Sequence, residues 1–308
     1  MEPPAEDKGD KSVSTTETES SSTSRNGGGQ LTAENRRAEV GGETFVYRRF
    51  GNDATESPPL LCLQHFRGNL DNWDPALVDR LAEDRELILL DNRGVGSSTG
   101  TVPDNVSDMA RDVVRFIDVI GLREIDVLGF SLGGFVAQEL ALVRPRLVRR
   151  LILAGTAPQG APRIHRWSDD VYALAAQDAL NPERFIKLFF SGSEESRARA
   201  IDFLKRITAR TVDRDAPTDI ATRDAQLEAI TRWGIPEPSK LLRLTAITQP
   251  TFVANGDNDT LMITENSHLL AHHLPNAQLR IYPDAGHGFL DQYPELFASH
   301  AKAFLNGG

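Results

Sequence analysis

One five-residue segment of the chain combines a serine with the backbone needed to expose it. Ser131 has a glycine two positions before it, Gly129, and another two positions after it, Gly133. The segment follows the apolar run Ile125–Phe130 and opens the helical pattern Leu132–Val143. The two glycines permit a turn so tight that larger side chains would collide, and the serine then projects beside the positive end of a helix. This placement predicts that Ser131 is a nucleophile.

A serine hydroxyl is a weak nucleophile unless a base takes its proton and a carboxylate orients the base. The best candidate base is His287, which follows the predicted strand Leu279–Tyr282 and lies between two glycines. Two carboxylates, Asp257 and Asp259, follow the predicted strand Pro250–Ala254. Loops that leave the carboxyl ends of parallel strands meet at one edge of a sheet, so we expect these groups to lie near the serine. The chain order of serine, acid and histidine is typical of one fold.

The elements around these segments predict the fold class. Short apolar runs alternate with amphipathic segments such as Val106–Ile120, which indicates a mostly parallel central sheet with helices on both faces. A hairpin over residues 38–47, turning at Gly41 and Gly42, is expected to form one edge of the sheet. The predicted strands are Leu60–Leu63, Leu87–Leu90, Ile125–Phe130, Leu151–Ala154, Pro250–Ala254 and Leu279–Tyr282.

The alternation also divides the chain into parts. Residues 1–30 are rich in Ser, Thr and acidic side chains and are predicted to be a disordered tail. Residues 31–157 and 246–308 are predicted to form the α/β core. Residues 158–245 carry helical patterns without a strand, namely 182–190, 194–211 and 218–233, and are predicted to form a helical lid. We expect one or two aromatic residues of the lid to line an apolar pocket and the others to fill its core. These aromatic residues are Trp167, Tyr172, Phe185, Phe189, Phe190, Phe203 and Trp233.

From about residue 36 to residue 305 the chain resembles the α/β-hydrolase superfamily. It is most similar to the lidded branch that contains small-molecule esterases, cofactor-free haloperoxidases and carbon–carbon bond hydrolases. The segment 91–98, Asp-Asn-Arg-Gly-Val-Gly-Ser-Ser, looks like the D-x-R-G-x-G-x-S loop of that branch, for which the resemblance implies a structural role. The resemblance also favours Asp259 over Asp257 as the acid. Because Ser131 stands at the turn, the chain differs from haloalkane dehalogenases and epoxide hydrolases, which place an aspartate there.

The resemblance places an oxyanion hole in the segment Gln64-His65-Phe66-Arg67-Gly68. Relatives usually carry His-Gly before the first donor, and here Gln64 and His65 occupy those positions. The implied donors are the backbone N–H groups of Phe66 and Leu132. His65 and Arg67 could bind a substrate carboxylate, although packing or surface roles explain them equally well.

Composition and charge exclude several other functions. The formal net charge of −10 disfavours nucleic acid as a partner. No apolar run approaches the roughly 20 residues needed to span a bilayer, and the N-terminus has no secretory signal, so we expect a cytoplasmic protein without a membrane partner. The single cysteine, Cys62, is predicted to be a buried core residue. His268 and His272 lack a third ligand, so no metal site is predicted.

The expected function is therefore that of a serine hydrolase. It would cleave a small hydrophobic carboxylic ester, thioester or lactone through a Ser131–His287–Asp259 triad, with no cofactor. Carbon–carbon bond hydrolysis and cofactor-free haloperoxidase or perhydrolase chemistry are alternatives with the same triad. A ligand-binding receptor on the same fold is the non-enzymatic alternative. The sequence indicates a small-molecule substrate as partner and leaves the oligomeric state open.

Overall fold

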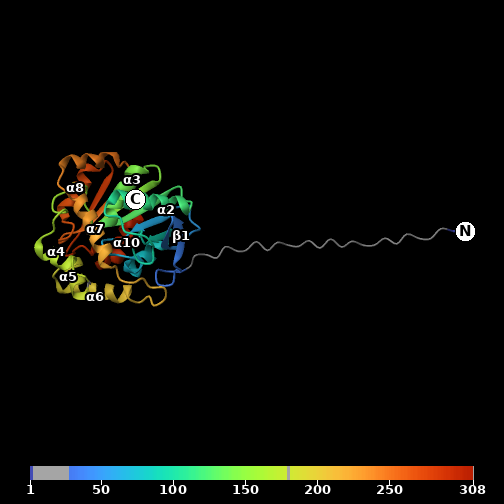
Figure 1. The fold of residues 1–308 in the computed structure, drawn as a ribbon, viewed down its shortest axis with the longest axis horizontal. Coiled ribbons are helices and arrows are strands. Elements are labelled where there is room, and N and C mark those ends of the chain that lie inside the picture. The colour runs from blue at the N-terminus through green and yellow to red at the C-terminus, as the bar shows by residue number, and fades with distance from the viewer. Residues whose placement is uncertain (3–27, 179–180, 308) are drawn as a thin grey trace.

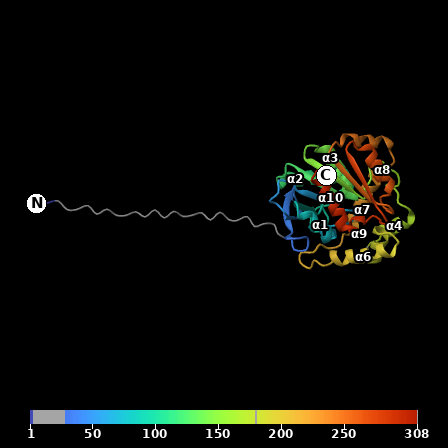
Figure 2. The same ribbon diagram turned by 180° about the vertical axis from the view of Figure 1, so that it is seen from behind.

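A computed structural model of the protein describes residues 1–2, 28–178 and 181–307. Its centre is an eight-stranded sheet with the order β1-β2-β4-β3-β5-β6-β7-β8 (Figures 1 and 2). The strands are β1 (Arg36–Val40), β2 (Glu43–Gly51), β3 (Leu60–Leu63), β4 (Glu86–Leu90), β5 (Ile125–Phe130), β6 (Val148–Ala154), β7 (Thr251–Gly256) and β8 (Ala277–Tyr282).

β2 runs antiparallel to both of its neighbours, β1 and β4. The remaining neighbouring pairs of the sheet, from β4–β3 to β7–β8, are all parallel. The hairpin of β1 and β2 lies at one edge and turns at Gly41 and Gly42, whose φ angles of 62° and 92° suit glycine. The predicted mostly parallel sheet is confirmed. The limits of β3 and β5 agree with the prediction, whereas β6 and β8 begin earlier and β7 continues through Gly256.

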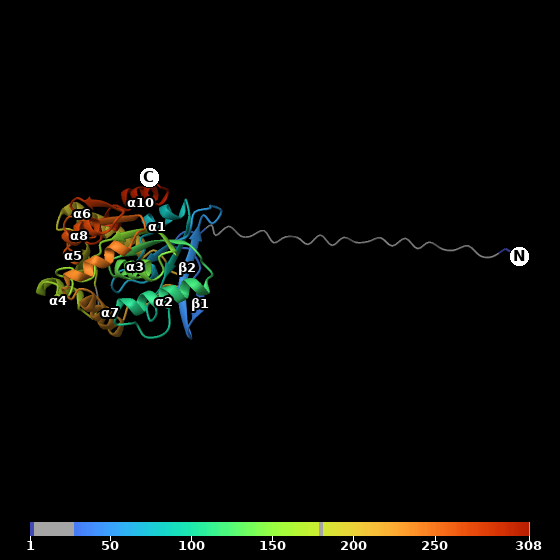
Figure 3. The same ribbon diagram turned by 90° about the horizontal axis from the view of Figure 1, so that it is seen from above.

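Helices cover both faces of the sheet. Helices α1 and α10 pack together on one face, and α2 and α3 pack together on the other (Figure 3). Helix α8 packs against β7 and β8. The helices of the core are α1 (Pro75–Ala82), α2 (Val106–Val119), α3 (Leu132–Val143), α8 (Thr264–His273), α9 (Phe289–Gln292) and α10 (Pro294–Leu305), with a short 3-10 helix η1 (Leu70–Asn72).

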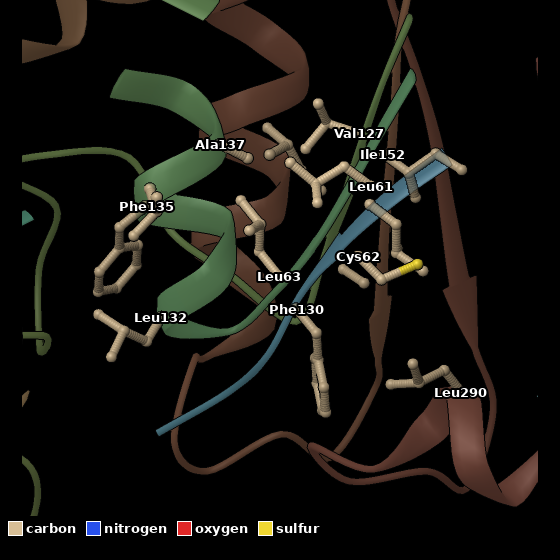
Figure 4. Packing of buried hydrophobic residues seen from close by; sticks show 14 of the residues in the cluster. Leu61, Cys62, Leu63, Val127, Phe130, Leu132, Phe135, Ala137, Ile152 and Leu290 are labelled. Atoms are coloured by element: carbon tan, nitrogen blue, oxygen red, sulfur yellow. The ribbon is translucent and has the colours of Figure 1, made fainter. Parts of the chain in front are cut away.

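The core forms where the central strands meet α3. Every residue of β3 and β5 is buried, as expected for parallel strands covered on both faces. Side chains of β3, β5 and α3 interdigitate in this region (Figure 4). Cys62 is part of this packing, and burial raises the pKa of its thiol, so the structure confirms it as a core residue.

The described residues between β6 and β7 form a helical insertion. Its helices are α4 (Asp169–Ala175), α5 (Pro182–Phe189), α6 (Glu194–Ile207), α7 (Ile220–Trp233) and a 3-10 helix η2 (Pro238–Ala246). No helix in the described ranges is long and apolar enough to cross a membrane.

Most of the predicted N-terminal tail, residues 3–27, lies outside the described residues. Gln30, the last residue of the predicted tail, is buried, and its side-chain amide donates to the Leu70 carbonyl at 2.5 Å. Arg210 of the insertion donates to the carbonyls of Gln30 and Ala33 at 3.1 and 2.9 Å. Gln30 and Ala33 therefore attach this end of the chain to both the core and the insertion.

Candidate active site

Ser131 lies at a strained turn between β5 and α3. Its φ and ψ angles are 56° and −118°, a conformation that non-glycine residues rarely adopt. A Cβ atom at Gly129 would lie 2.5 Å from the carbonyl oxygen of Gly133, and one at Gly133 would overlap the carbonyl oxygen of Leu63. The close approach of backbones on both sides of the serine thus requires the two glycines that the sequence pattern singled out.

The structure brings His287 and Asp259 into direct contact. The Nδ1 atom of His287 lies 2.7 Å from Oδ2 of Asp259, and both side chains are almost fully buried. The other carboxylate oxygen, Oδ1, accepts hydrogen bonds from the backbone N–H groups of Leu261 and Met262, each at 2.9 Å. These two bonds fix the carboxylate plane and aim Oδ2 at the imidazole.

Asp257, the alternative acid, does not contact the imidazole. It is exposed, and its Oδ1 accepts from the backbone N–H of Ala285 at 3.1 Å and from the side-chain amide of Asn258 at 2.6 Å. Its contacts are therefore those of a residue that stabilises a turn.

Two aromatic rings enclose the imidazole of His287. The ring of Phe130 stacks on it with centroids 5.0 Å apart, and Phe189 of α5 meets it edge-on at 5.2 Å. An aromatic face attracts a cation, so Phe130 is placed to stabilise a protonated imidazole. Neither ring was assigned this role from the sequence, because the contacts join segments far apart in the chain.

Ser131 and His287 line the same cavity. In the described part of the chain, no hydrogen bond joins the Ser131 hydroxyl to the imidazole. Such bonds often tighten only when a substrate is bound. The structure therefore places the nucleophile and the base of the predicted triad in one site, with the acid in contact with the base.

Three of the four backbone N–H groups of residues 65–68, in the loop after β3, donate hydrogen bonds within the described structure. The N–H of His65 donates to Oε1 of Gln64 at 2.9 Å, that of Arg67 to Gln226 at 2.7 Å, and that of Gly68 to the His65 carbonyl at 3.0 Å. Within the described residues, the N–H of Phe66 has no acceptor. The N–H of Leu132, the first residue of α3, likewise has no partner within the helix.

The departure from the usual His-Gly pair has a structural explanation. The side chain of Gln64 is buried and folds back over the loop, where it accepts the His65 N–H and packs against Gly68. A glutamine thus braces the turn that exposes the Phe66 N–H. The sequence offered no signal for this contact beyond the presence of an unusual side chain in the motif.

His65 and Arg67 make contacts that favour packing over substrate binding. Burial lowers the pKa of His65 to about 3, so its imidazole is neutral at physiological pH. Its Nδ1 lies 2.7 Å from the Phe66 carbonyl, which can only accept, so the proton resides on Nδ1. Arg67 donates to the carbonyls of Gln177 and Asp178 in the insertion at 2.6 and 2.8 Å. The guanidinium group therefore ties residues 64–68, called the oxyanion loop after their predicted role, to the insertion.

The cavity at Ser131 is small, apolar and covered by the insertion. Its volume is about 10 Å³, roughly the space of one water molecule. The core contributes His65, Phe66, Ser131, Leu261 and His287, and the insertion contributes Trp167, Ala175, Leu188 and Phe189. Two of the seven aromatic residues predicted for the lid, Trp167 and Phe189, thus line the cavity. Tyr172 is 53% exposed and does not belong to the interior of the insertion.

The comparison with known families agrees with this geometry. The family described as the alpha/beta hydrolase fold matches residues 58–294. The chain belongs to the α/β hydrolase fold family. A solved alpha/beta hydrolase fold protein from Chitinophaga pinensis is 45% identical, with a TM-score of 0.86 and coverage of 91% of this chain and 100% of its own.

Two relatives have names that state different activities. The poly(3-hydroxyalkanoate) depolymerase of Ectopseudomonas oleovorans is 30% identical over 80% of this chain and 84% of its own length. The pimeloyl-(acyl-carrier protein) methyl ester esterase of Nitrosomonas europaea is 29% identical over 79% of this chain and 93% of its own. The chain is thus a hydrolase of this family.

The D-x-R-G-x-G-x-S segment, residues 91–98, begins with a buried carboxylate that contacts both η1 and the insertion. Asp91 is fully buried, and its Oδ1 accepts the backbone N–H of Leu70 at 2.9 Å. Its carboxyl group meets that of Asp215 from the insertion, and burial followed by the Asp215 charge raises the pKa of Asp91 well above its usual range. Ser97 donates to Asp215 at 2.6 Å. The segment therefore connects η1 of the core to the insertion.

Proposed function

We propose that the protein is a serine hydrolase that cleaves a small hydrophobic carboxylic ester, thioester or lactone through Ser131, His287 and Asp259. The observation that carries the proposal is the His287–Asp259 hydrogen bond of 2.7 Å at the cavity lined by Ser131. The apolar lining favours an apolar acyl group. One relative is named for a methyl ester, which supports ester cleavage as the reaction.

In the proposed mechanism, Oγ of Ser131 attacks the substrate carbonyl while Nε2 of His287 takes the hydroxyl proton. Asp259 holds the proton on Nδ1 and stabilises the imidazolium that forms. The negative charge on the carbonyl oxygen is stabilised by the N–H groups of Phe66 and Leu132 and by the N-terminus of α3.

The tetrahedral intermediate collapses when His287 donates its proton to the leaving alcohol or thiol. An acyl group then remains on Ser131. Water attacks this acyl-enzyme while His287 takes a proton from it, and the resulting intermediate releases the carboxylic acid and restores the serine. The insertion over the cavity acts as a lid that excludes bulk water from these steps.

Hydrolysis of p-nitrophenyl esters by the intact protein, Ser131→Ala and Ser239→Ala tests this proposal. Ser239 lies on η2 and donates to Glu237, so it serves as a matched serine control. We expect turnover above about 1 s⁻¹ for the best ester with the intact protein and the control, and background rates with Ser131→Ala.

A fluorophosphonate probe provides an independent readout. The activated serine attacks phosphorus and fluoride leaves, so peptide mass spectrometry should locate the adduct on Ser131. If no ester is cleaved above background and no adduct forms, the serine hydrolase proposal fails and ligand reception becomes the better explanation. Labelling of Ser131 without ester cleavage would instead direct the search to carbon–carbon bond hydrolysis or perhydrolysis.

A further inference from the structure

A single side chain separates the closed cavity at Ser131 from a large open recess. The recess has a volume of about 770 Å³ and lies between the segment 163–169 and the loop that contains Asp259. Among the described residues, Trp167 alone lines both the cavity and the recess. The indole thus forms a partition between the reacting serine and open space.

The small size of the cavity means that one of its walls must move. A volume of about 10 Å³ holds one water molecule, whereas pockets that bind small molecules span roughly 300–1,000 Å³. An ester therefore reaches Ser131 only if a lining side chain is displaced. The partition whose displacement adds the most space is Trp167.

A second recess, of about 370 Å³, meets the cavity on the side of His65 and Phe66. That wall is held in place by the oxyanion loop. The backbone N–H groups of His65, Arg67 and Gly68 are all bonded, and the His65 ring packs edge-on against Phe130 and Phe189 at 5.3 and 4.9 Å. Displacing this wall would dismantle the donors that the proposed reaction uses.

Trp167 is held much more weakly. Its side chain makes one hydrogen bond, from Nε1 to the carbonyl of Leu261 at 3.0 Å, and one edge contact with Phe66 at 6.0 Å. It is buried, but residues 165, 166 and 168–170 around it are exposed. The ring can therefore swing outward at the cost of its bond to the Leu261 carbonyl, without breaking a hydrogen bond between two backbone groups of the core.

We infer that Trp167 is a gate that sets the length of substrate the enzyme accepts. The inference rests on the proposed function, since it assumes that Ser131 attacks an ester. With the indole inward, the cavity has no room for a long acyl chain. With the indole outward, the cavity and the recess join, and a longer chain extends from the serine into the recess.

Kinetics on p-nitrophenyl esters from acetyl to octanoyl test the gate in four proteins: the intact enzyme, Trp167→Ala, Trp167→Phe and Leu188→Ala. Leu188 is the matched control because it lines the cavity but not the recess. Trp167→Phe keeps a ring at the partition and removes the bond to Leu261.

We expect Trp167→Ala to raise the octanoyl-to-acetyl ratio of kcat/KM at least tenfold, mainly through a lower KM for the longer ester. Trp167→Phe should give a smaller increase. Leu188→Ala should favour acyl chains only a few carbons longer and still discriminate against octanoyl. Equal profiles for Trp167→Ala and Leu188→Ala, or an unchanged profile for Trp167→Ala, would overturn the gate while leaving the serine hydrolase proposal intact.

A binding measurement distinguishes failure of the gate from failure of the function. Octanamide, a neutral analogue of the longer substrate, is titrated calorimetrically into Ser131→Ala with and without Trp167→Ala. We expect the double variant to bind octanamide at least tenfold more tightly, whether or not the intact protein cleaves esters. Equal affinities for the two proteins would refute the gate even if ester turnover is observed.

Discussion

Replacing Asp259 with asparagine tests the orientation of the catalytic base. The carboxylate of Asp259 accepts two backbone N–H groups on Oδ1, from Leu261 and Met262, and the His287 Nδ1–H on Oδ2. In Asp259→Asn, only one of the two terminal atoms is an oxygen. Turning that oxygen toward His287 would leave two buried N–H groups unpaired, at about 1–3 kcal/mol each. The amide oxygen should therefore stay on the backbone and present its NH₂ to the imidazole.

The consequence of this orientation is the wrong tautomer of His287. An NH₂ group that faces Nδ1 makes Nδ1 the acceptor, so the imidazole proton moves to Nε2. The protonated Nε2 can no longer accept the proton of Ser131. We expect kcat to fall about 10⁴-fold, or about 5.4 kcal/mol at 1.36 kcal/mol per tenfold. The change replaces one buried group with another of the same shape, so the thermal unfolding temperature should shift by only a few degrees.

The assay is steady-state hydrolysis of the best p-nitrophenyl ester, with Asp257→Asn as the matched control on the same turn. The asparagine of the control still accepts the Ala285 N–H, so its kcat should remain within about threefold of the intact protein. Retention of more than a tenth of the activity in Asp259→Asn would refute the tautomer argument. A large loss in Asp257→Asn instead would make Asp257 the acid.

Two further predictions concern the support of the site. Gly133→Ala places a methyl group against the Leu63 carbonyl, so urea unfolding should show a loss of about 1–3 kcal/mol in the free energy of unfolding, and ester hydrolysis should cease. The control Gly192→Ala has open space at its Cβ, so its free energy of unfolding should stay within about 0.5 kcal/mol of the intact protein. Equal effects of the two changes would contradict the steric argument. The pKa of Asp91 is raised in the folded protein, so the fold favours its protonated form. The free energy of unfolding therefore falls as the pH rises above the pKa of about 3.9 that an aspartate has in the unfolded chain. Asp91→Asn resembles the protonated form, so its free energy of unfolding should fall less between pH 5 and pH 8 than that of the intact protein. If the two proteins show parallel curves of unfolding free energy against pH, Asp91 does not titrate in this range.

Much of the core could be predicted from the sequence because its signals are local. Apolar strands such as Ile125–Phe130, followed at once by a glycine-flanked serine, mark a parallel strand and its turn within ten residues. His287 and the pair Asp257 and Asp259 could be placed at one edge of the sheet because each follows a strand, and the carboxyl ends of parallel strands meet there. The choice of Asp259 over Asp257 came from the family resemblance. The helix limits at Leu132 and Val143 also agree with the pattern.

The contacts between the insertion and the core could not be predicted in the same way. Which aromatic residues line the cavity depends on how five helical segments pack against the core. Trp167 reaches the cavity from the loop before α4, and Phe189 reaches it from the last position of α5. The pairing of Asp91 with Asp215 joins residues more than 100 positions apart, and the local motif that contains Asp91 does not indicate its partner. The attachment of Arg67 to insertion carbonyls likewise depends on tertiary placement.

The serine turn itself shows why a five-residue motif is insufficient evidence for a nucleophile. A backbone conformation like that of Ser131 costs about 1–3 kcal/mol and persists only when the surroundings impose it. Those surroundings belong to the neighbouring strand and the residues after it: the Ser131 N–H donates to the Ala154 carbonyl at 2.9 Å, and the Ser131 carbonyl accepts from the Thr156 hydroxyl at 2.8 Å. The glycines make room for the turn, whereas β6 and Thr156 hold it in place. A glycine-flanked serine without such a strand beside it would relax, and its hydroxyl would no longer face a histidine.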